Sequence, residues 1–395
     1  MRGRDGWDCL IVGAGPAGST AAWKLAERGR SVLLIEKRQE IGVPVRCGEG
    51  ISKQLLDIIG LEPDGRWISS EMDGAIIHSP SMIDIVLGPE IAGPEVGYVI
   101  QRDNFDQALA RKAARAGAVI EVRAEALSMK RVDNGWNVRI KDLNGVRTER
   151  ASMVIAADGF ESHVASWAGI DTSLSLKNMD TCIQYEMVGV EVVDRFTEFY
   201  LGRKKAPGGY VWCFPKGKDI ANIGLGINGS MISGRADPKK YLDDFIRNDE
   251  RFNKGTVTEI NGGGVSVSLP IEKTVSDNFL VIGDAARMID PLTGGGVYNG
   301  CYAALQAAIT VDEAMEMSDL SAKGLLPFER RWRDHLENEM VRNFLAKEKL
   351  LEVSDEILDK VIDAIAGYDL KEVNTEELLK AIASKYPEIL DDISI

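Results

Sequence analysis

Cysteine and histidine are scarce in this chain, and their scarcity argues against two kinds of site. The 395 residues include five cysteines and three histidines. The cysteines are widely scattered and form no C-x-x-C pair, which argues against both a zinc site and a disulfide framework. The histidines, His78, His163 and His335, are far apart in the sequence, so we assign none of them a catalytic role. We therefore expect no metal centre, and a reducing compartment.

Long apolar runs and an excess of positive charge are also missing. No run approaches the roughly 20 apolar residues that span a bilayer, and the N-terminus has no apolar stretch of the signal-peptide type. Lys and Arg total 47 against 61 Asp and Glu, a net charge of −14. This charge repels phosphate backbones and argues against general nucleic-acid binding. We expect a cytoplasmic protein, at most peripheral to the cytoplasmic membrane face.

The composition is otherwise that of a folded protein. Hydrophobic residues make up 45% and charged residues 27% of the chain, which leaves no room for extensive disorder. At about 100–200 residues per domain, the length predicts two or three domains.

The first 36 residues predict a βαβ unit that binds a dinucleotide. A buried apolar strand over residues 8–12 runs into Gly13, Gly15 and Gly18, and an alanine-rich helix and a second apolar strand follow. Gly13 allows a tight turn, Gly15 lets backbone N–H groups approach a pyrophosphate, and Gly18 permits close packing of helix on strand. Glu36 ends the second strand, where its carboxylate can accept hydrogen bonds from both hydroxyls of an adenosine ribose.

Two later strands favour FAD over NAD as the dinucleotide. One strand ends in Asp158 and another in Asp284, which places both carboxylates where an open α/β sheet binds its ligand. Asp284 can bond a sugar-alcohol hydroxyl of a flavin. Three glycines at residues 294–296 then open a helix whose N-terminal dipole suits the negative charge of a reduced flavin.

Between these motifs the pattern changes to longer, alternating strands. Residues 74–88 predict a hairpin, and residues 174–269 predict a mostly antiparallel sheet with one helix near residues 238–247. Asp103 is expected to cap a helix that runs to about Ala116. We predict an α/β fold with three parts: a discontinuous Rossmann-like FAD-binding domain (residues 1–73, 97–170 and 270–325), an inserted antiparallel-sheet substrate domain (74–96 and 171–269) and a helical C-terminal segment (326–395).

Three longer motifs carry a resemblance to a known family. They are Pro-Val-Arg-Cys-Gly-Glu-Gly at residues 44–50, Pro-Gly-Gly-Tyr-Val-Trp-Cys-Phe-Pro at 207–215 and Asp-Pro-Leu-Thr-Gly-Gly-Gly at 290–296. Together they resemble the archaeal geranylgeranyl reductases, over essentially the whole chain. The glycine and aspartate motifs are similar to the FAD-binding pattern of the wider group of p-hydroxybenzoate hydroxylase-like flavoproteins.

The resemblance implies an enzyme that saturates the prenyl chains of digeranylgeranylglycerophospholipids. Its implied partners are the prenylated lipid, an external electron donor (NAD(P)H, ferredoxin or another reduced carrier) and a peripheral contact with the membrane. By family position, FAD would contact Gly13, Gly15, Ala17, Gly18, Glu36, Arg46, Cys47, Gly48, Gly50, Arg102, Ala124, Asp284, Gly295, Gly296 and Val297. For Arg102 the alternative is an exposed arginine at a strand end.

The aromatic motif suits an isoprenoid chain. Tyr210, Trp212 and Phe214 lie two residues apart, so on a strand all three side chains point to one face. Such an aromatic wall can bind a prenyl chain and stabilise a carbocation through cation–π attraction. The spacing alone favours an ordinary core; the resemblance favours substrate binding.

The proton donor has two candidates, Cys47 and Glu49. Cys47 can donate a proton beside the flavin or can fill space as a small hydrophobe. Glu49 would have a raised pKa if its carboxyl lay in an apolar cavity, and would otherwise be a solvated loop charge.

An isolated trisubstituted alkene has no carbonyl to make it electrophilic, so we expect protonation to accompany hydride transfer from N5 of the reduced flavin. The first competing function is an aromatic monooxygenase on the same fold. The second is a non-redox prenyl-binding protein, similar to the GDP dissociation inhibitors.

Two further features have ordinary explanations. The glycines at residues 262–264 lack the strand-then-helix context of a phosphate site and predict a turn or bulge. Basic residues at 203–205, Lys216 and Lys218 flank the aromatic motif. They could hold a lipid phosphate, but a solvated loop face is the commoner meaning of such a run.

Overall fold

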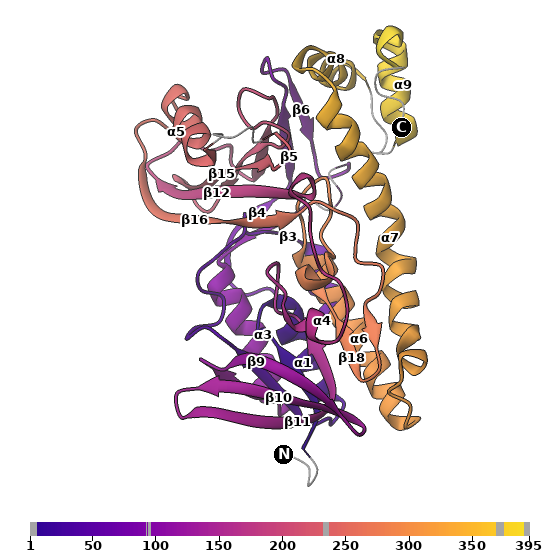
Figure 1. Ribbon diagram of the computed structural model, residues 1–395. Coiled ribbons are helices and arrows are strands. Elements are labelled where there is room, and N and C mark those ends of the chain that lie inside the picture. Colours follow the sequence, from indigo (N-terminus) through magenta and orange to yellow (C-terminus); the bar gives the residue numbers. More distant parts are fainter. Residues whose placement is uncertain (1–5, 92, 94–95, 232–236, 369–374, 391–395) are drawn as a thin grey trace.

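Three sheets organise the computed structural model, which describes residues 6–91, 93, 96–231, 237–368 and 375–390 (Figure 1). An eight-stranded sheet lies near the N-terminus in this view, and a seven-stranded sheet lies at the opposite end of the molecule. The long helix α7 (Ala322–Glu352) runs beside both of them. This arrangement leaves a space between the two sheets with α7 along one side.

The eight-stranded sheet has a buried parallel centre. Its strands are β1 (Trp7–Val12), β2 (Val32–Glu36), β8 (Val119–Val122), β9 (Glu125–Val132), β10 (Gly135–Asp142), β11 (Gly145–Ala156), β17 (Val275–Ser276) and β18 (Phe279–Val281). The order β18-β11-β1-β2-β8 is parallel throughout, and its central strands are almost completely buried. Helix α1 (Pro16–Glu27) packs between α3 (Arg102–Ala116) and α6 (Val297–Glu316). The ligand-binding edge of such a sheet is its carboxyl end.

The seven-stranded sheet follows the order β16-β12-β15-β14-β13-β5-β6. Its strands are β5 (Gly74–His78), β6 (Asp84–Leu87), β12 (Met179–Val188), β13 (Phe196–Tyr200), β14 (Val211–Pro215), β15 (Ile220–Asn228) and β16 (Thr256–Ser266). The predicted hairpin is present as β5 and β6. Every pair is antiparallel except β13 with β5, which run parallel because β5 comes from a distant part of the chain. Helix α5 (Pro238–Asn248) packs against β12 and β15.

A small third sheet connects the larger two. It contains β3 (Gly50–Ser52), β7 (Gly97–Ile100) and β4 (Ile68–Met72), and helix α2 (Lys53–Ile59) packs beside it. The predicted α/β fold class is confirmed. The domain boundaries remain a prediction.

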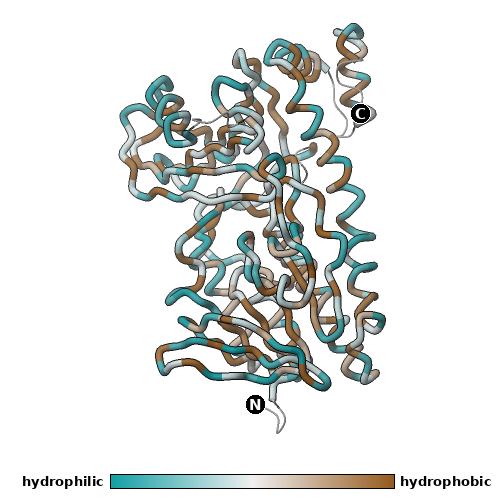
Figure 2. Tube along the Cα trace, viewed as in Figure 1, coloured by the Kyte–Doolittle hydropathy of each residue, from teal (hydrophilic) through white to brown (hydrophobic). Residues whose placement is uncertain are grey.

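The C-terminal segment is helical in its described part. Helix α7 is followed by α8 (Asp355–Ala366) and α9 (Thr375–Lys385). Figure 2 shows apolar and polar residues alternating along α7, as expected for a helix with one buried face. Its first half packs Phe328 and Trp332 into the core of the eight-stranded sheet. None of the helices in the described ranges combines the length and the apolarity that a membrane span requires.

Two sequence-based expectations about local structure are wrong. Helix α3 begins at Arg102 with Gln101 as its N-cap, so Asp103 lies in the first turn and is not the cap. The helix starts early because the Arg102 N–H donates to a buried carboxylate, that of Glu49.

The glycines at residues 262–264 form neither a turn nor a bulge. They lie in β16 and pair with residues 181–183 of β12. A Cβ at Gly264 would lie 2.8 Å from the ring of Phe160, and one at Gly263 would lie 3.5 Å from the side chain of Arg46. Glycine therefore lets neighbouring side chains lie directly on the strand.

Candidate functional site

A cavity of about 970 Å³ lies between the two large sheets, and this is the candidate site. This volume is at the upper end of the range for small-molecule and cofactor pockets. One side is formed by the glycine loop after β1 and the start of α6. The other is formed by the aromatic motif and by β12 and β16, and α7 contributes His335, Leu336 and Met340.

The glycine loop has the form that a pyrophosphate needs. Gly13 has φ of +103°, and a Cβ there would collide with the carbonyl oxygen of Ala157, while a Cβ at Gly18 would collide with that of Gly13. At Gly15, by contrast, an added Cβ would meet no atom of the described residues within 4 Å. Helix α1 begins there without a side-chain cap, so its first N–H groups remain available to an anion.

Backbone N–H groups hold the Glu36 carboxylate, the predicted ribose ligand, in place. Glu36 accepts hydrogen bonds from the N–H groups of Ala14 and Arg38, each over 3.0 Å, and its carboxylate lines the cavity. Ala124 donates its N–H to the Glu36 carbonyl over 2.8 Å. The remaining acceptor positions of this carboxylate are suited to the two hydroxyls of an adenosine ribose.

Of the two strand-end aspartates, Asp284 is the one that fits a ligand. It follows β18, and it is exposed to the cavity. The protein around the cavity desolvates its carboxyl and raises the pKa of Asp284, and the charge of Arg102 partly offsets this. Asp158 also lines the cavity, but its carboxylate accepts from the Ser162 hydroxyl and from the N–H groups of His163 and Val164. Asp158 therefore holds its own loop in place.

The start of α6 completes a cradle of the shape FAD requires. Gly296 is the N-cap of α6, with Val297 as its first residue, and a Cβ at Gly296 would lie 3.2 Å from Asp284 Oδ1. Ala17 reaches across from α1, since a Cβ at Gly283 would lie 3.0 Å from that of Ala17. The residues present thus fit FAD, with the pyrophosphate at α1, a ribose at Glu36 and the ribityl chain at Asp284.

The loop at residues 44–50 closes the cavity opposite this cradle. Cys47 lines the cavity, and its Sγ accepts a hydrogen bond from the Glu49 N–H over 3.2 Å. A Cβ at Gly48 would lie 2.9 Å from the ring of Phe214 and one at Gly50 would lie 3.4 Å from it, so glycine lets the loop touch the aromatic motif. Arg46 also lines the cavity and pairs with Glu161 over 3.4 Å.

Glu49 lies neither in an apolar cavity nor in solvent, contrary to both expectations. The residue is 3% exposed, and its carboxylate accepts from Lys216 Nζ and Asn222 Nδ2, each over 2.6 Å, and from the Arg102 N–H over 2.8 Å. These three donors hold the carboxylate in place. Glu49 therefore anchors the loop, and its case as a proton donor is weakened.

Lys216 is likewise part of the interior and is not a solvated loop charge. Its Nζ pairs with Glu49 over 2.6 Å and with Glu186 over 2.8 Å. Burial alone would lower the pKa of Lys216, but the two carboxylates raise it above its ordinary value. Lys216 is thus held as a cation beneath the loop and is unavailable to a lipid phosphate.

The Arg102 side chain is only 15% exposed, so the alternative of an exposed strand-end arginine is wrong. Its guanidinium donates to Asp106 through two hydrogen bonds of 2.9 and 3.0 Å. Burial alone would lower its pKa, but Asp106 and the sulfur of Cys47 raise it well above the ordinary value. A permanent cation therefore lies beside Cys47.

The aromatic motif forms the predicted wall. The Tyr210 and Trp212 ring centroids are 6.0 Å apart, and those of Trp212 and Phe214 are 6.5 Å apart. All three rings line the cavity. Phe199 of β13, missed in the sequence, packs edge-on against both Tyr210 and Phe214 at 5.5 Å.

Sequence reasoning also missed the polar side chains of the seven-stranded sheet that face the cavity. Asp180, Cys182 and Gln184 line the cavity and occupy alternate positions on β12, so they share one face of the strand. Burial raises the pKa of Asp180 to about 6, although the Asn228 hydrogen bond and the charge of Lys347 lower it. The period-2 polar stripe was the available signal for this face.

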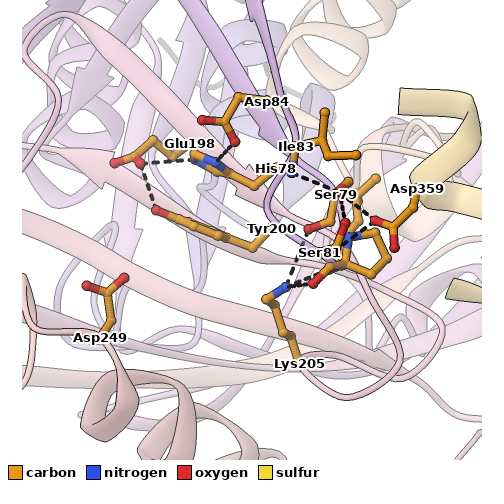
Figure 3. Close-up of polar contacts among 12 residues, drawn as sticks. His78, Ser79, Ser81, Ile83, Asp84, Glu198, Tyr200, Lys205, Asp249 and Asp359 are labelled. Carbon is orange, nitrogen blue, oxygen red and sulfur yellow. Dashed lines mark hydrogen bonds and ion pairs between the residues drawn. The ribbon is translucent and has the colours of Figure 1, made fainter. Parts of the chain in front are cut away.

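Two other basic residues, Arg203 and Lys205, also serve the fold. Arg203 donates to the carbonyls of Leu351, Glu352 and Val353 at the end of α7. Lys205 donates to the Pro80 carbonyl over 2.8 Å, as Figure 3 shows. These contacts attach the end of α7 and the β5–β6 hairpin to the loop before β14.

The three histidines occupy different surroundings. His78 lies away from the cavity, between Asp84 at 2.7 Å and Glu198 at 3.1 Å, and stacks on Tyr200 (Figure 3). His163 and His335 line the cavity, and His335 Nε2 lies 3.1 Å from the Tyr298 hydroxyl.

The fold and the cradle together define an FAD-binding α/β flavoprotein. The family pattern described as geranylgeranyl reductase catalytic domain matches residues 178–265, and that of an NAD(P)-binding Rossmann-like domain matches residues 11–49. The digeranylgeranylglycerophospholipid reductase of Thermoplasma volcanium is 44% identical over 98% of both chains. The chain belongs to the digeranylgeranylglycerophospholipid reductase family.

Solved structures agree with this assignment. The crystal structure of a geranylgeranyl bacteriochlorophyll reductase-like protein from Thermoplasma acidophilum matches with a TM-score of 0.92 and 43% identity, covering 98% of each chain. A halogenase solved in complex with FAD shares the fold at a TM-score of 0.69 and 16% identity, covering 91% of this chain and 79% of its own.

Proposed function

We propose that this chain is an FAD-dependent reductase that saturates the isolated double bonds of geranylgeranyl chains in archaeal-type ether lipids. The observation that carries the proposal is the contact between the loop at residues 44–50 and the aromatic wall. A Cβ at Gly48 of this loop would lie 2.9 Å from Phe214. In this proposal residues 1–73, 97–170 and 270–325 bind FAD, and residues 74–96 and 171–269 bind the prenyl chain.

The division of labour follows from the residues. When bound, FAD supplies hydride to the alkene. The Cys47 thiol donates the proton, and its thiolate is stabilised by Arg102 until solvent reprotonates it. The wall of Tyr210, Trp212 and Phe214 binds the chain, excludes water and stabilises positive charge developing on the tertiary carbon. One proton and one hydride then saturate each double bond, so atoms and charge balance.

The test is mass spectrometry of a geranylgeranyl ether lipid incubated with chemically reduced, FAD-loaded protein. We expect a gain of two mass units for each double bond reduced, because a proton and a hydride are added. A gain of sixteen would instead indicate the monooxygenase alternative, and an unchanged lipid that stays bound would indicate a prenyl-binding protein.

Two partners belong to the same proposal. The described residues form no second nucleotide-binding βαβ unit, so we propose an external electron donor, either transient NAD(P)H, ferredoxin or another reduced carrier. Peripheral contact with the membrane would allow the lipid to enter. Val341, Leu345 and Leu350 of α7, which are 37%, 45% and 41% exposed, support such a contact.

FAD binding can be tested separately from turnover at Gly15. Gly15→Val should leave the protein folded, because a side chain there meets open space, but should fill the room that the pyrophosphate needs. We expect a purified protein with little bound flavin and an unchanged melting temperature in the apo form. The matched control is Gly65→Val, since Gly65 is exposed and a Cβ there also meets no described atom within 4 Å.

A further inference from the structure

Three side-chain amides from three neighbouring strands converge on the loop that carries Cys47. Gln184 of β12 donates to the Cys47 carbonyl over 3.1 Å, and Asn222 of β15 donates to the Gly48 carbonyl over 3.2 Å. Asn261 of β16, with its amide nitrogen turned toward the loop, donates to the Val45 carbonyl over 2.9 Å. We call these three residues the amide clamp.

The sheet register places the amide clamp where it is. Gln184 lies directly opposite Asn261 on β16 and opposite Gly224 on β15, and Asn222 lies opposite Glu186, two residues further along β12. The three amides are therefore neighbours on one face of a rigid sheet, while the loop that they hold has no regular structure between Gly42 and Gly48. The loop takes its position from the sheet.

Within the amide clamp, Gln184 is itself oriented by Trp212. The indole N–H donates to Gln184 Oε1 over 2.8 Å, which turns the amide nitrogen toward the Cys47 carbonyl. Trp212 is fixed in turn, because a Cβ on Gly224 would lie within 2.6 Å of its ring. Gln184 is 3% and Trp212 8% exposed, and buried hydrogen bonds of this kind are costly to leave unmade.

We propose that Gln184, oriented by the Trp212 indole N–H, is a positioning residue that places the Cys47 thiol for proton donation. The inference rests on the proposed function, in which Cys47 is the proton donor. It gives Trp212 a second task besides forming the wall. A phenylalanine at this position would preserve the aromatic surface but would have no N–H to orient the amide.

Substitutions separate the two tasks of Trp212, which are to orient the Gln184 amide and to form the aromatic wall. Gln184→Leu removes the amide, and Gln184→Glu keeps an acceptor for Trp212 but has no donor for the Cys47 carbonyl. Trp212→Phe removes the indole N–H and keeps a smaller aromatic ring in the wall. Each should lower kcat by about tenfold or more with KM changed less than threefold, because a misplaced catalytic group costs rate and not prenyl binding. Phe214→Leu, which trims the wall, should mainly raise KM.

A second readout measures the position of Cys47 without turnover. Peptide mass spectrometry gives the rate at which iodoacetamide alkylates Cys47 in the FAD-loaded protein, with the wild-type protein measured alongside as the reference. The Gln184 and Trp212 variants should change the Cys47 rate severalfold relative to wild type, and Phe214→Leu should not. The Gln184→Leu/Trp212→Phe double variant should be no worse than the more affected single variant, since both substitutions break one chain of bonds.

The proposal is overturned if Gln184→Leu or Trp212→Phe, folded and FAD-loaded, retains both the wild-type kcat and the wild-type alkylation rate. If Gln184→Leu fails to fold, Trp212→Phe decides by the same criteria. If Cys47→Ala retained turnover, the proton-donor role would fail, but the alkylation rates would still report whether the amide clamp positions the loop.

Discussion

Cys47→Ala should bind FAD normally and lose turnover by a factor on the order of 10²–10⁴, the usual contribution of a positioned general acid. The thiol is the acidic group that the loop presents to the cavity beside Arg102, whereas the Glu49 carboxylate accepts from three donors. Without the thiol the alkene has no nearby proton source, and hydride addition alone is slow. The measurement is single-turnover oxidation of the reduced, lipid-loaded protein.

The matched control is Cys213→Ala. Cys213 lies between Trp212 and Phe214 in the same motif, but its side chain is fully buried in the core on the other face of the sheet. This variant should retain turnover within a fewfold of wild type. Wild-type turnover in Cys47→Ala would remove the thiol from the mechanism.

Lys216→Met should destabilise the protein by about 3–5 kcal/mol, the usual cost of leaving buried carboxylates without their cation. The Lys216 side chain is 3% exposed and serves Glu49, Glu186 and the Gln101 amide oxygen at once. The methionine preserves most of the volume but none of the charge. Urea unfolding at neutral pH measures the change, and Glu49→Gln added to Lys216→Met should recover part of it, because one of the two unpaired charges is then removed.

Lys218→Met is the control for this prediction. Lys218 lies two residues along the chain and is exposed, so its loss should change stability by no more than about 0.5 kcal/mol. An equally small effect of Lys216→Met would mean that water reaches the two carboxylates and that the loop has another anchor.

The cofactor cradle could be predicted because its signals are local. The roles of Gly13, Gly15 and Gly18 follow from contacts within one βαβ unit, and Asp284 follows its strand directly. The strands were located less well where pairing is long-range. β11 pairs with β10 along its first half and with β1 along its second, so it is one strand of twelve residues where the sequence predicted only its end.

The polar half of the site could not be predicted, because its partners are distant in the sequence. Gln184 meets Cys47 across 137 positions and Lys216 meets Glu49 across 167. Spacing along the chain distinguishes one face of a strand from the other, but it does not say which loop arrives at that face. For this reason the sequence left Glu49 as either a proton donor or a solvated charge and favoured a solvated charge for Lys216, whereas together they form a buried pair.

Helix α7 is attached to the rest of the protein at both of its ends. Its first half packs Trp332 into the core of the eight-stranded sheet. Near its end, Lys347 donates to the Val267 carbonyl, and Arg203 donates to a carbonyl of the final turn. The helix therefore fixes the distance between the two halves of the protein. Because α7 also lines the cavity through His335, Leu336 and Met340, the same helix fixes the spacing of the two cavity walls.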